Sequence, residues 1–518
     1  MSTTVQTTHD SIELRSLSLA GTSQEIGKAN SFPEPQAKYN KASGSPSTED
    51  AVYAGVRPSA LRVTLTILQP SFVNFLTSFT NGLITVGLPA IARDIHLART
   101  LYLWPSSVYG LTSGSILLLA GAVADLIGAK KVELVGCVLV VSIVASAVPS
   151  GRPRNIGYAC LGASQVLGFS TGLVASGVMV DRIGWRPGFY ISGGALLATA
   201  FAAFRGLPSV APSVGEDDTR SVWRKLYDEV DWVGGVMASA GLALLSYVLA
   251  ALSADLNSIK SPLNATLLPL SVVLMAAFPL WMNYRQKHGK PALVPNSLWR
   301  NTTFASTCLM VLLSYGVMNS MELFSSLYYQ EIQDASALTS SLQFLPSMTV
   351  GCVLNLTVGI FIHKVPARWL VTVSSVLCAG APLLMALVNP AWSYWYLEFW
   401  AQVLAPMSAD ILFTVGLIII SDVFPEKTQG LAGGVFNTTA QFGFSLGTGI
   451  CQLVALGVAG NSSGGGGHGS NESSDVDPKA LLEGYRASFW TMFAFMLACA
   501  LLAVFGLRKA GTVGLKRD

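Results

Sequence analysis

Charged residues are scarce in this sequence. Only 12% of its 518 residues are Asp, Glu, Lys or Arg, whereas 51% are hydrophobic, and the formal net charge is +3. Soluble domains usually carry about 25% charged residues, so this composition excludes an ordinary soluble protein. The small net charge gives no reason to expect nucleic acid as a partner. The five histidines are scattered along the chain and predict no metal site.

Cysteine is also sparse. All seven cysteines lie within apolar segments, and none forms a Cys-x-x-Cys pair. They therefore read as small buried residues, which excludes a disulfide framework and a thiolate metal site. The sequence also contains no recognisable nucleophile–base pair. These absences argue against an enzyme.

Long apolar runs dominate what is present, and the mean hydropathy is +0.51. About 20 apolar residues cross a bilayer as a helix, so each run predicts a membrane span. The sequence thus predicts an all-α polytopic membrane protein. The expected spans are residues 63–91, 103–124, 132–148, 156–180, a helix ending near 204, 232–252, 267–282, 303–327, 337–362, 369–388, 396–420, 431–458 and 489–507.

The runs divide the chain into five regions. Residues 1–61 are rich in Ser, Thr, Pro and Gly and predict a disordered cytoplasmic tail. We expect a first transmembrane unit at 62–206, a central loop with two linking spans at 207–300, a second unit at 301–507 and a cytoplasmic tail at 508–518. A Gly/Ser-rich loop at 461–474 is expected outside the cell, where Asn461 and Asn471 are candidates for N-glycosylation.

The turn GAVADLIGAKK, residues 121–131, lies between two expected spans. Gly121 and Gly128 permit a sharp reversal, and Lys130 and Lys131 indicate the cytoplasmic side. The turn resembles the loop between the second and third helices of the major facilitator superfamily, of pattern G-x-L-A-D-R-x-G-R-K, which Asp125 also fits. The resemblance implies a gating role for these five residues. An ordinary short cytoplasmic loop is the alternative.

The segment GFSTGLVASG carries Gly168, Gly172 and Gly177 at helical spacing. Small residues about one turn apart let helix backbones approach closely. The segment resembles the fifth-helix motif of the family's drug:proton antiporters, although Leu173 replaces its Pro. Packing without an antiport role is the alternative. DWVGG at Asp231 resembles the start of the seventh helix of the fourteen-span antiporters, which have an inserted pair of linking spans.

An internal repeat joins the two halves of the chain. QVLGFSTG at 165–172 recurs as QFGFSLG at 441–447, as expected of a transporter built from two six-helix units. Gly359 and Pro425 are 66 positions apart, whereas the corresponding Gly121 and Pro149 are only 28 apart. The first copy is thus about 38 residues short, near one span plus a loop. The family's fourth-helix motif R-x-x-Q-G is missing there, and we expect residues 132–148 to be tilted, broken or re-entrant.

Two acids and a polar stripe are the candidates for transport chemistry. Asp410 lies near the middle of an expected span, where a charge costs at least ~2.5–3.5 kcal/mol, so we expect it to exchange a proton. A carboxyl bonded to a neighbouring helix is the alternative. Glu322 lies closer to the outer end of its span. Asn81 belongs to a polar stripe along the first span, as on a cavity-facing helix.

The resemblance to the major facilitator superfamily covers about residues 63–507. It implies two six-helix pseudo-repeats plus two linking spans, with the first repeat shortened. The implied function is proton-coupled efflux of amphipathic organic compounds, such as a drug, toxin or secondary metabolite. We therefore expect a monomer in the plasma membrane, with the bilayer and a small-molecule substrate as partners and a proton gradient in place of a cofactor. The alternatives are a proton-coupled importer of a small nutrient and a defective, non-transporting shortened form.

Overall fold

The computed structural model describes residues 60–96, 152–206, 230–254, 256–290, 292–296, 298–361, 365–424, 426–462 and 478–508. All of them belong to one compact domain, Pro58–Asp518, which includes both of the expected transmembrane units. The expected turn 121–131, the span 103–124, the short segment 132–148 and Asn471 lie outside the described residues. The expectations for these parts therefore stay predictions.

The described chain is helical, and it contains ten stretches of helix long and apolar enough to cross a membrane. This confirms the predicted all-α membrane fold. The main helices are α2 (Ala60–Asp94), α6 (Arg152–Arg182), α7 (Arg186–Gly206), α9 (Trp232–Ala254), α10 (Pro262–Lys287), α11 (Thr302–Leu327), α12 (Ala337–Gln343), α13 (Leu345–Phe361), α14 (Ala367–Ala386), α15 (Glu398–Leu404), α16 (Met407–Val423), α17 (Glu426–Ser462) and α18 (Pro478–Gly506). Short helical turns cover Leu256–Lys260, Leu298–Arg300 and Tyr328–Ile332.

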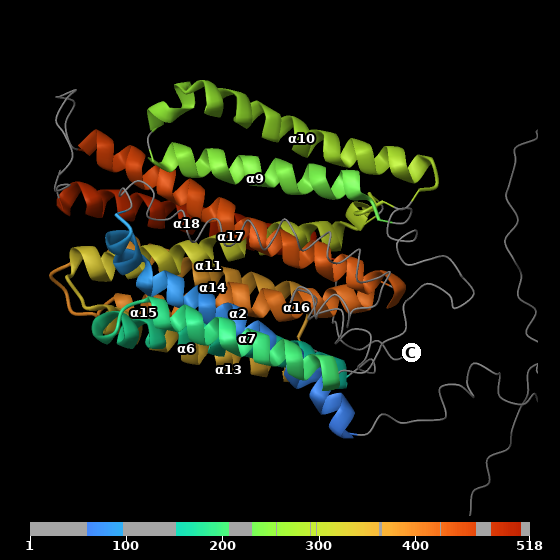
Figure 1. Ribbon diagram of the computed structural model, residues 1–518, viewed down its shortest axis with the longest axis horizontal. Helices are drawn as coiled ribbons and strands as arrows, with labels where there is room; N and C mark the ends of the chain where they lie inside the picture. Colours follow the sequence, from blue (N-terminus) through green and yellow to red (C-terminus); the bar gives the residue numbers. More distant parts are fainter. Residues whose placement is uncertain are drawn as a thin grey trace, which may run out of the picture. The chain divides into compact units, whose positions relative to one another are not determined.

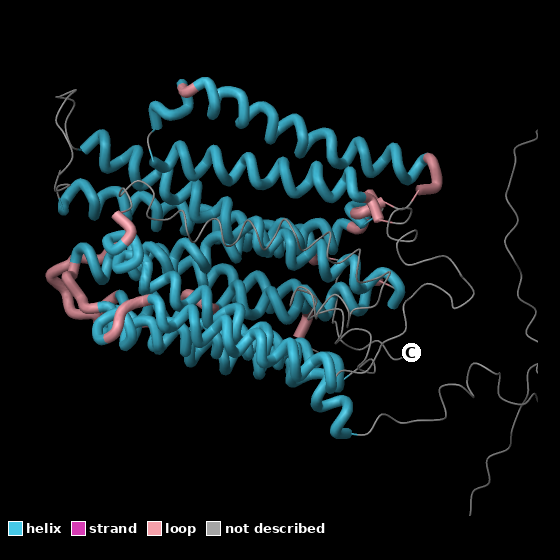
Figure 2. The backbone as a smooth tube through the Cα atoms, viewed as in Figure 1, coloured by secondary structure: helices cyan, strands magenta, loops and turns pink. Residues whose placement is uncertain are grey.

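The long helices run side by side along the horizontal axis of the view (Figure 1), with short connections at both ends of the bundle (Figure 2). We call the end where α2 and α11 finish the Thr85 end. The opposite end, where α9 begins and α10 finishes, is the Asp231 end. Helix α10 packs on α9, and α9 packs on α17, so the linking pair lies along one side of the second unit.

Local sequence explains where several helices begin and turn. The Asn301 side chain accepts hydrogen bonds from the first backbone N–H groups of α11 at 3.0 and 3.2 Å. Ser336 likewise accepts from Thr339 N at the start of α12. Such caps satisfy N–H groups that have no partner within the helix. Gly184 has a positive φ of 86°, which permits the three-residue turn between α6 and α7.

Several predicted boundaries are wrong because helices extend through polar sequence. Residues 152–155, which lie between the spans expected at 132–148 and 156–180, form the first turn of α6, which begins at Arg152. The span expected to end at 180 continues to Arg182, and only residues 183–185 separate α6 from α7. Asn461 lies in the last turn of α17, not in a loop. Two predicted continuous spans are each divided into two helices, one at Phe344 and the other at Ala405–Pro406.

Glycines fix the contact between α2 and α6. A Cβ atom at Gly168 would overlap the backbone at Phe75, and one at Gly172 would overlap the backbone at Phe79. Only glycine therefore allows the two backbones to approach this closely.

The second unit repeats this arrangement between α11 and α17. A Cβ atom at Gly443 would overlap the Leu312 backbone, and one at Gly447 would overlap Gly316. Because Gly443 and Gly447 occupy the same places in the repeated Gly-Phe-Ser-x-Gly motif as the glycines of α6, the sequence repeat is also a repeat of helix packing.

Candidate functional site

A cavity of about 100 Å³ lies between the two repeated helix pairs. Helices from both units form its wall, so a molecule in it would contact both halves of the bundle. Its lining residues are Asn74, Thr77, Ser78, Asn81, Gln165, Val166, Phe169, Ser170, Leu173, Tyr315, Met318, Met321, Glu322, Phe344, Ser347, Met348, Gln402, Ala405, Pro406, Asp410, Gln441 and Phe444.

Asp410 lines this cavity and is only 7% exposed. Asn355 of α13 is a polar neighbour of this acid. Asn355 is itself held by its amide, which donates to Gly351 O at 3.0 Å, and by Thr414, which donates to its Oδ1 at 3.0 Å. A Cβ atom at Gly351 would come within 2.5 Å of the Asp410 carboxylate, so the absence of a side chain there makes room for the acid.

The break between α15 and α16 places Asp410 in the first turn of α16. Backbone N–H groups at a helix N-terminus favour a negative charge, whereas burial disfavours it. These opposing effects suit a carboxyl that gains and loses a proton. The cavity is also lined by Phe344, at the break between α12 and α13. Two helices are thus interrupted where they meet the cavity.

Glu322 and Asn81 line the same cavity, from α11 and α2 respectively. The three candidates that the sequence predicted on three distant spans are therefore brought together. The Asn81 side chain is 8% exposed, and its Oδ1 has no hydrogen-bond partner among the described residues. Tyr315 of α11 and Gln165 of α6 also line the cavity, one from each unit.

The three glycines of the antiporter-like segment do not line the cavity. Gly168 and Gly172 face α2 within the first unit. A Cβ atom at Gly177 would meet Ser341 and Leu338 of α12, so this glycine lies where the two units touch. The geometry gives all three a packing function, and an antiport role for them is still only a prediction.

Polar contacts join the units at the Thr85 end of the bundle. Ser326 Oγ donates to Thr85 O at 3.3 Å, and Gln330 Nε2 donates to Val86 O at 3.4 Å. The Asp181 carboxylate accepts from the backbone N–H of α12 at 3.2 Å. Together these bonds hold the units against each other beyond the cavity.

Sequence reasoning missed Glu398, a second buried acid. It is 1% exposed at the start of α15, and its Oε1 accepts from Gln333 at 2.7 Å and from Tyr328 at 3.4 Å. Its Oε2 is buried without a partner among the described residues. One turn further on, Gln402 lines the cavity and donates to Tyr329 at 3.2 Å. Glu398 follows an aromatic segment at a span boundary, where an acid is expected in water, so its burial could not be predicted from the sequence.

Two sets of candidates cannot be placed. The loop residues Gly121, Asp125, Gly128, Lys130 and Lys131 lie outside the described part of the chain, as does Asn471.

Two helix pairs with repeated glycine packing, enclosing a cavity with polar and apolar walls within a membrane bundle, define a transporter assembled from two related units. The chain belongs to the Major Facilitator Superfamily, because the model of that family matches residues 138–448, more than half of the sequence. This is a family of transporters rather than enzymes.

Named relatives agree with this assignment. MFS-type transporter 1 of Pyricularia oryzae is 35% identical over 88% of this chain and 85% of its own length. The efflux pump terJ of Aspergillus terreus is 22% identical over 78% of this chain and 79% of its own length. The crystal structure of the human organic anion transporter MFSD10 superposes with a TM-score of 0.53 at 14% identity, covering 86% of this chain and all of that one, and it supports the fold alone.

Proposed function

We propose that this chain is a proton-coupled efflux transporter for amphipathic organic compounds. The observation that carries the proposal is the position of Asp410, a buried acid in the wall of a cavity shared by both units. An ionisable residue at this depth carries a high energetic cost, so it is expected to have a function. Proton uptake from one side and release to the other would couple substrate movement to the proton gradient.

The lining of the cavity supports an amphipathic substrate. Methionine and aromatic side chains, such as Met318, Met321 and Phe444, offer adaptable apolar contacts. Gln165 and Gln402 add uncharged hydrogen-bonding groups. At about 100 Å³ the cavity is smaller than the roughly 300–1,000 Å³ of ordinary ligand pockets, so substrate binding requires the units to separate.

The linking pair α9 and α10 supports membership of the fourteen-span antiporter type, and terJ is one relative named as an efflux pump. We also propose that the first unit is shortened by about one span. The alignment with the Pyricularia oryzae relative has 525 positions but includes only 88% of this 518-residue chain. That relative therefore has residues with no counterpart here. Restoring the absent segment should raise transport at equal surface expression.

We propose that the chain is a plasma-membrane monomer whose Thr85 end faces outward. Arg285, Lys287 and Lys290 lie at the Asp231 end, as expected for the cytoplasmic side. Asn461, at the Thr85 end of α17, and Asn471 would then be open to glycosylation. Membrane-impermeant thiol reagents should label cysteines introduced at 461–474 in intact cells but not at 285–290. The reverse pattern would contradict this orientation.

The proposed transport is tested in two steps. Cells that express the chain should tolerate amphipathic toxins better than cells that lack it, whereas an importer would make them more sensitive. In proteoliposomes, an imposed pH gradient should drive accumulation of the same toxin, and a protonophore should abolish the accumulation. Accumulation that is indifferent to the pH gradient would contradict proton coupling.

A further inference from the structure

A second and larger cavity lies outside the two-unit interface. Its volume is about 300 Å³, against about 100 Å³ for the central cavity. The second cavity thus reaches the lower end of ordinary ligand-pocket sizes. The linking pair forms one wall, and α11 and α17 form the other. Its lining residues are Ala238, Leu242, Met275, Phe278, Val294, Trp299, Leu312, Val435, Thr438, Thr439, Phe442 and Leu446.

This cavity offers almost nothing to a polar ligand. All but two of its lining residues are apolar. The Thr439 hydroxyl donates to Val435 O at 2.8 Å, and Thr438 Oγ1 is a buried atom without a hydrogen-bond partner among the described residues. The cavity therefore suits a hydrocarbon chain, and in a membrane the abundant hydrocarbon is a lipid acyl chain.

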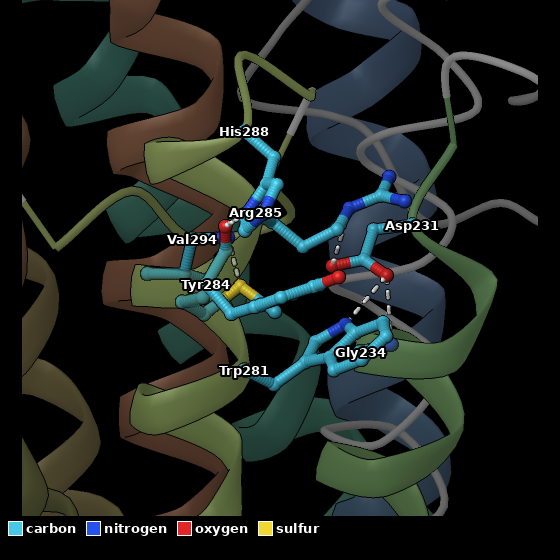
Figure 3. Close-up of polar contacts among 8 residues, drawn as sticks. Asp231, Gly234, Trp281, Tyr284, Arg285, His288 and Val294 are labelled. Atoms are coloured by element: carbon cyan, nitrogen blue, oxygen red, sulfur yellow. Dashed lines mark hydrogen bonds and ion pairs between the residues drawn. The ribbon is translucent and has the colours of Figure 1, made fainter.

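A polar clamp holds the outer wall of the cavity in place (Figure 3). Asp231 precedes α9 and is 2% exposed. Its Oδ1 accepts from Gly234 N at 2.9 Å and from Trp281 Nε1 of α10 at 3.1 Å, and Arg285 Nε lies 3.8 Å from its Oδ2. Because one buried carboxylate binds both linking helices, the α9–α10 wall is fixed at the Asp231 end.

The segment that follows α10 joins the cavity to a group of cations. Val294 and Trp299 line the cavity, and Val294 N donates to Met282 Sδ at 3.4 Å. Lys287, Lys290 and Arg300 lie next to these residues in the chain and are exposed. The ion pairs found within the described ranges, Arg186–Asp94 and Arg285–Asp231, include none of these three cations.

We propose that this cavity binds one acyl chain of an anionic phospholipid, with its phosphate headgroup on Lys287, Lys290 and Arg300. An apolar cavity whose lining residues Val294 and Trp299 lie in the same short segment of the chain as three exposed cations matches both parts of such a lipid. The lipid would fill the space between α10 and the second unit. In that region α10 packs on α9, and α9 in turn packs on α17 of the second unit. The linking pair then has a function of its own as part of a lipid site.

The test uses phosphatidylcholine nanodiscs to which a minor fraction of a brominated lipid is added. The brominated lipid is phosphatidylglycerol in one sample and phosphatidylcholine in the other. Bromine quenches tryptophan on contact, and the contribution of Trp299 is the difference between the protein and its Trp299→Phe variant. Brominated phosphatidylglycerol should quench Trp299 more strongly than brominated phosphatidylcholine. Replacing Lys287, Lys290 and Arg300 by Gln should lower the relative affinity on the order of a hundredfold at low salt. A Lys287→Arg/Lys290→Arg variant should keep it.

Filling the cavity tests the position of the acyl chain. Ala238→Phe should abolish the preferential quenching, whereas Val236→Phe on the same helix should not, because Val236 is 62% exposed and does not line the cavity. If Ala238→Phe does not reach the membrane, Ala238→Ile serves as the smaller filling variant. Equal quenching by both lipids would overturn the proposal. So would quenching that survives the filling variants, or displacement of the lipid by soluble glycerol phosphate, which would show a headgroup site alone.

Discussion

The α2–α6 pair and the α11–α17 pair share their packing but differ in chemistry. Both pairs have glycine motifs that fit against a partner backbone. Toward the cavity, however, α2 presents Asn74, Thr77 and Asn81, which are uncharged, whereas α11 presents Glu322. The other acid of the cavity, Asp410, also belongs to the second unit. Duplication thus preserved how the helices meet, while the acids found among the described lining residues of the cavity all belong to the second unit.

The difference suggests a division of labour within the proposed cycle. The first unit supplies hydrogen-bonding groups of fixed charge state, which can hold a substrate at any pH. The second unit supplies groups whose charge can change. Rocking of one unit against the other would then move the ionisable side chains of the second unit past the uncharged side chains of the first.

The largest expected effect comes from the shared packing. Gly168→Ala and Gly443→Ala should each abolish accumulation of folded protein at the cell surface, because the new methyl group overlaps a backbone with no room to move. Overpacking of this kind costs roughly 1–3 kcal/mol or more. Surface expression and thermal unfolding in detergent measure the effect.

Glycines with open surroundings are the control for this pair. Gly434→Ala and Gly457→Ala lie in the same helix as Gly443, and an added Cβ at either position meets nothing within 4 Å. Both variants should express normally. If only one of the two packed glycines proved essential, the packing of the two units would not be equivalent.

The second effect tests the chemical difference. Asp410→Asn should reduce pH-gradient-driven transport to the level of protein-free liposomes while substrate counterflow without a gradient continues, because the amide keeps the shape but cannot ionise. Glu322→Gln in the same cavity is the comparison and should retain part of the driven transport. Driven transport that persists in Asp410→Asn would return this acid to a structural role.

The sequence predicted the elements of the fold well because apolar runs of membrane length leave few alternatives to a helix. It also predicted that Asp410, Glu322 and Asn81 belong to a cavity, since polar groups in such runs must find polar surroundings. Their convergence on one cavity depended on helix packing, which a single sequence does not specify.

Other features could not be predicted because they depend on tertiary contacts. The break before α16 lies at Pro406, and a neighbouring side chain bonds to a backbone carbonyl there: Cys378 Sγ donates to Ala405 O at 3.1 Å. Pro382 lies within α14 without such a break, so proline alone does not locate one. Glu398 escaped notice because its burial comes from residues of a distant segment, Tyr328 and Gln333.

The third effect separates the two buried acids of the second unit. Glu398→Gln should keep transport within about fivefold of the wild type, because the amide oxygen still accepts from Gln333. Glu398→Ala should lower the free energy of unfolding by about 1–3 kcal/mol, since the buried donors of Gln333 and Tyr328 lose their acceptor. Thermal unfolding and transport of both variants distinguish these outcomes. Loss of pH-driven transport in Glu398→Gln would give this acid a coupling role instead.

The smallest expected effect concerns the contact between the two units. Gln330→Ala removes the hydrogen bond from the helical turn Tyr328–Ile332 to Val86 O, together with a bond to Ser326 Oγ, and leaves the helix packing intact. One such bond is worth about 0.5–1.5 kcal/mol, so the population open at the Thr85 end should rise about two- to tenfold. A cysteine at Ser78, in the cavity wall, should react faster by that factor with an impermeant maleimide. Thr339→Ala is the matched control, because Thr339 contacts Ser336 within the second unit. Equal reaction rates in all three proteins would show that this bond does not hold the units together, and would leave that role to the remaining contacts, at Ser326, Asp181 and Gly177.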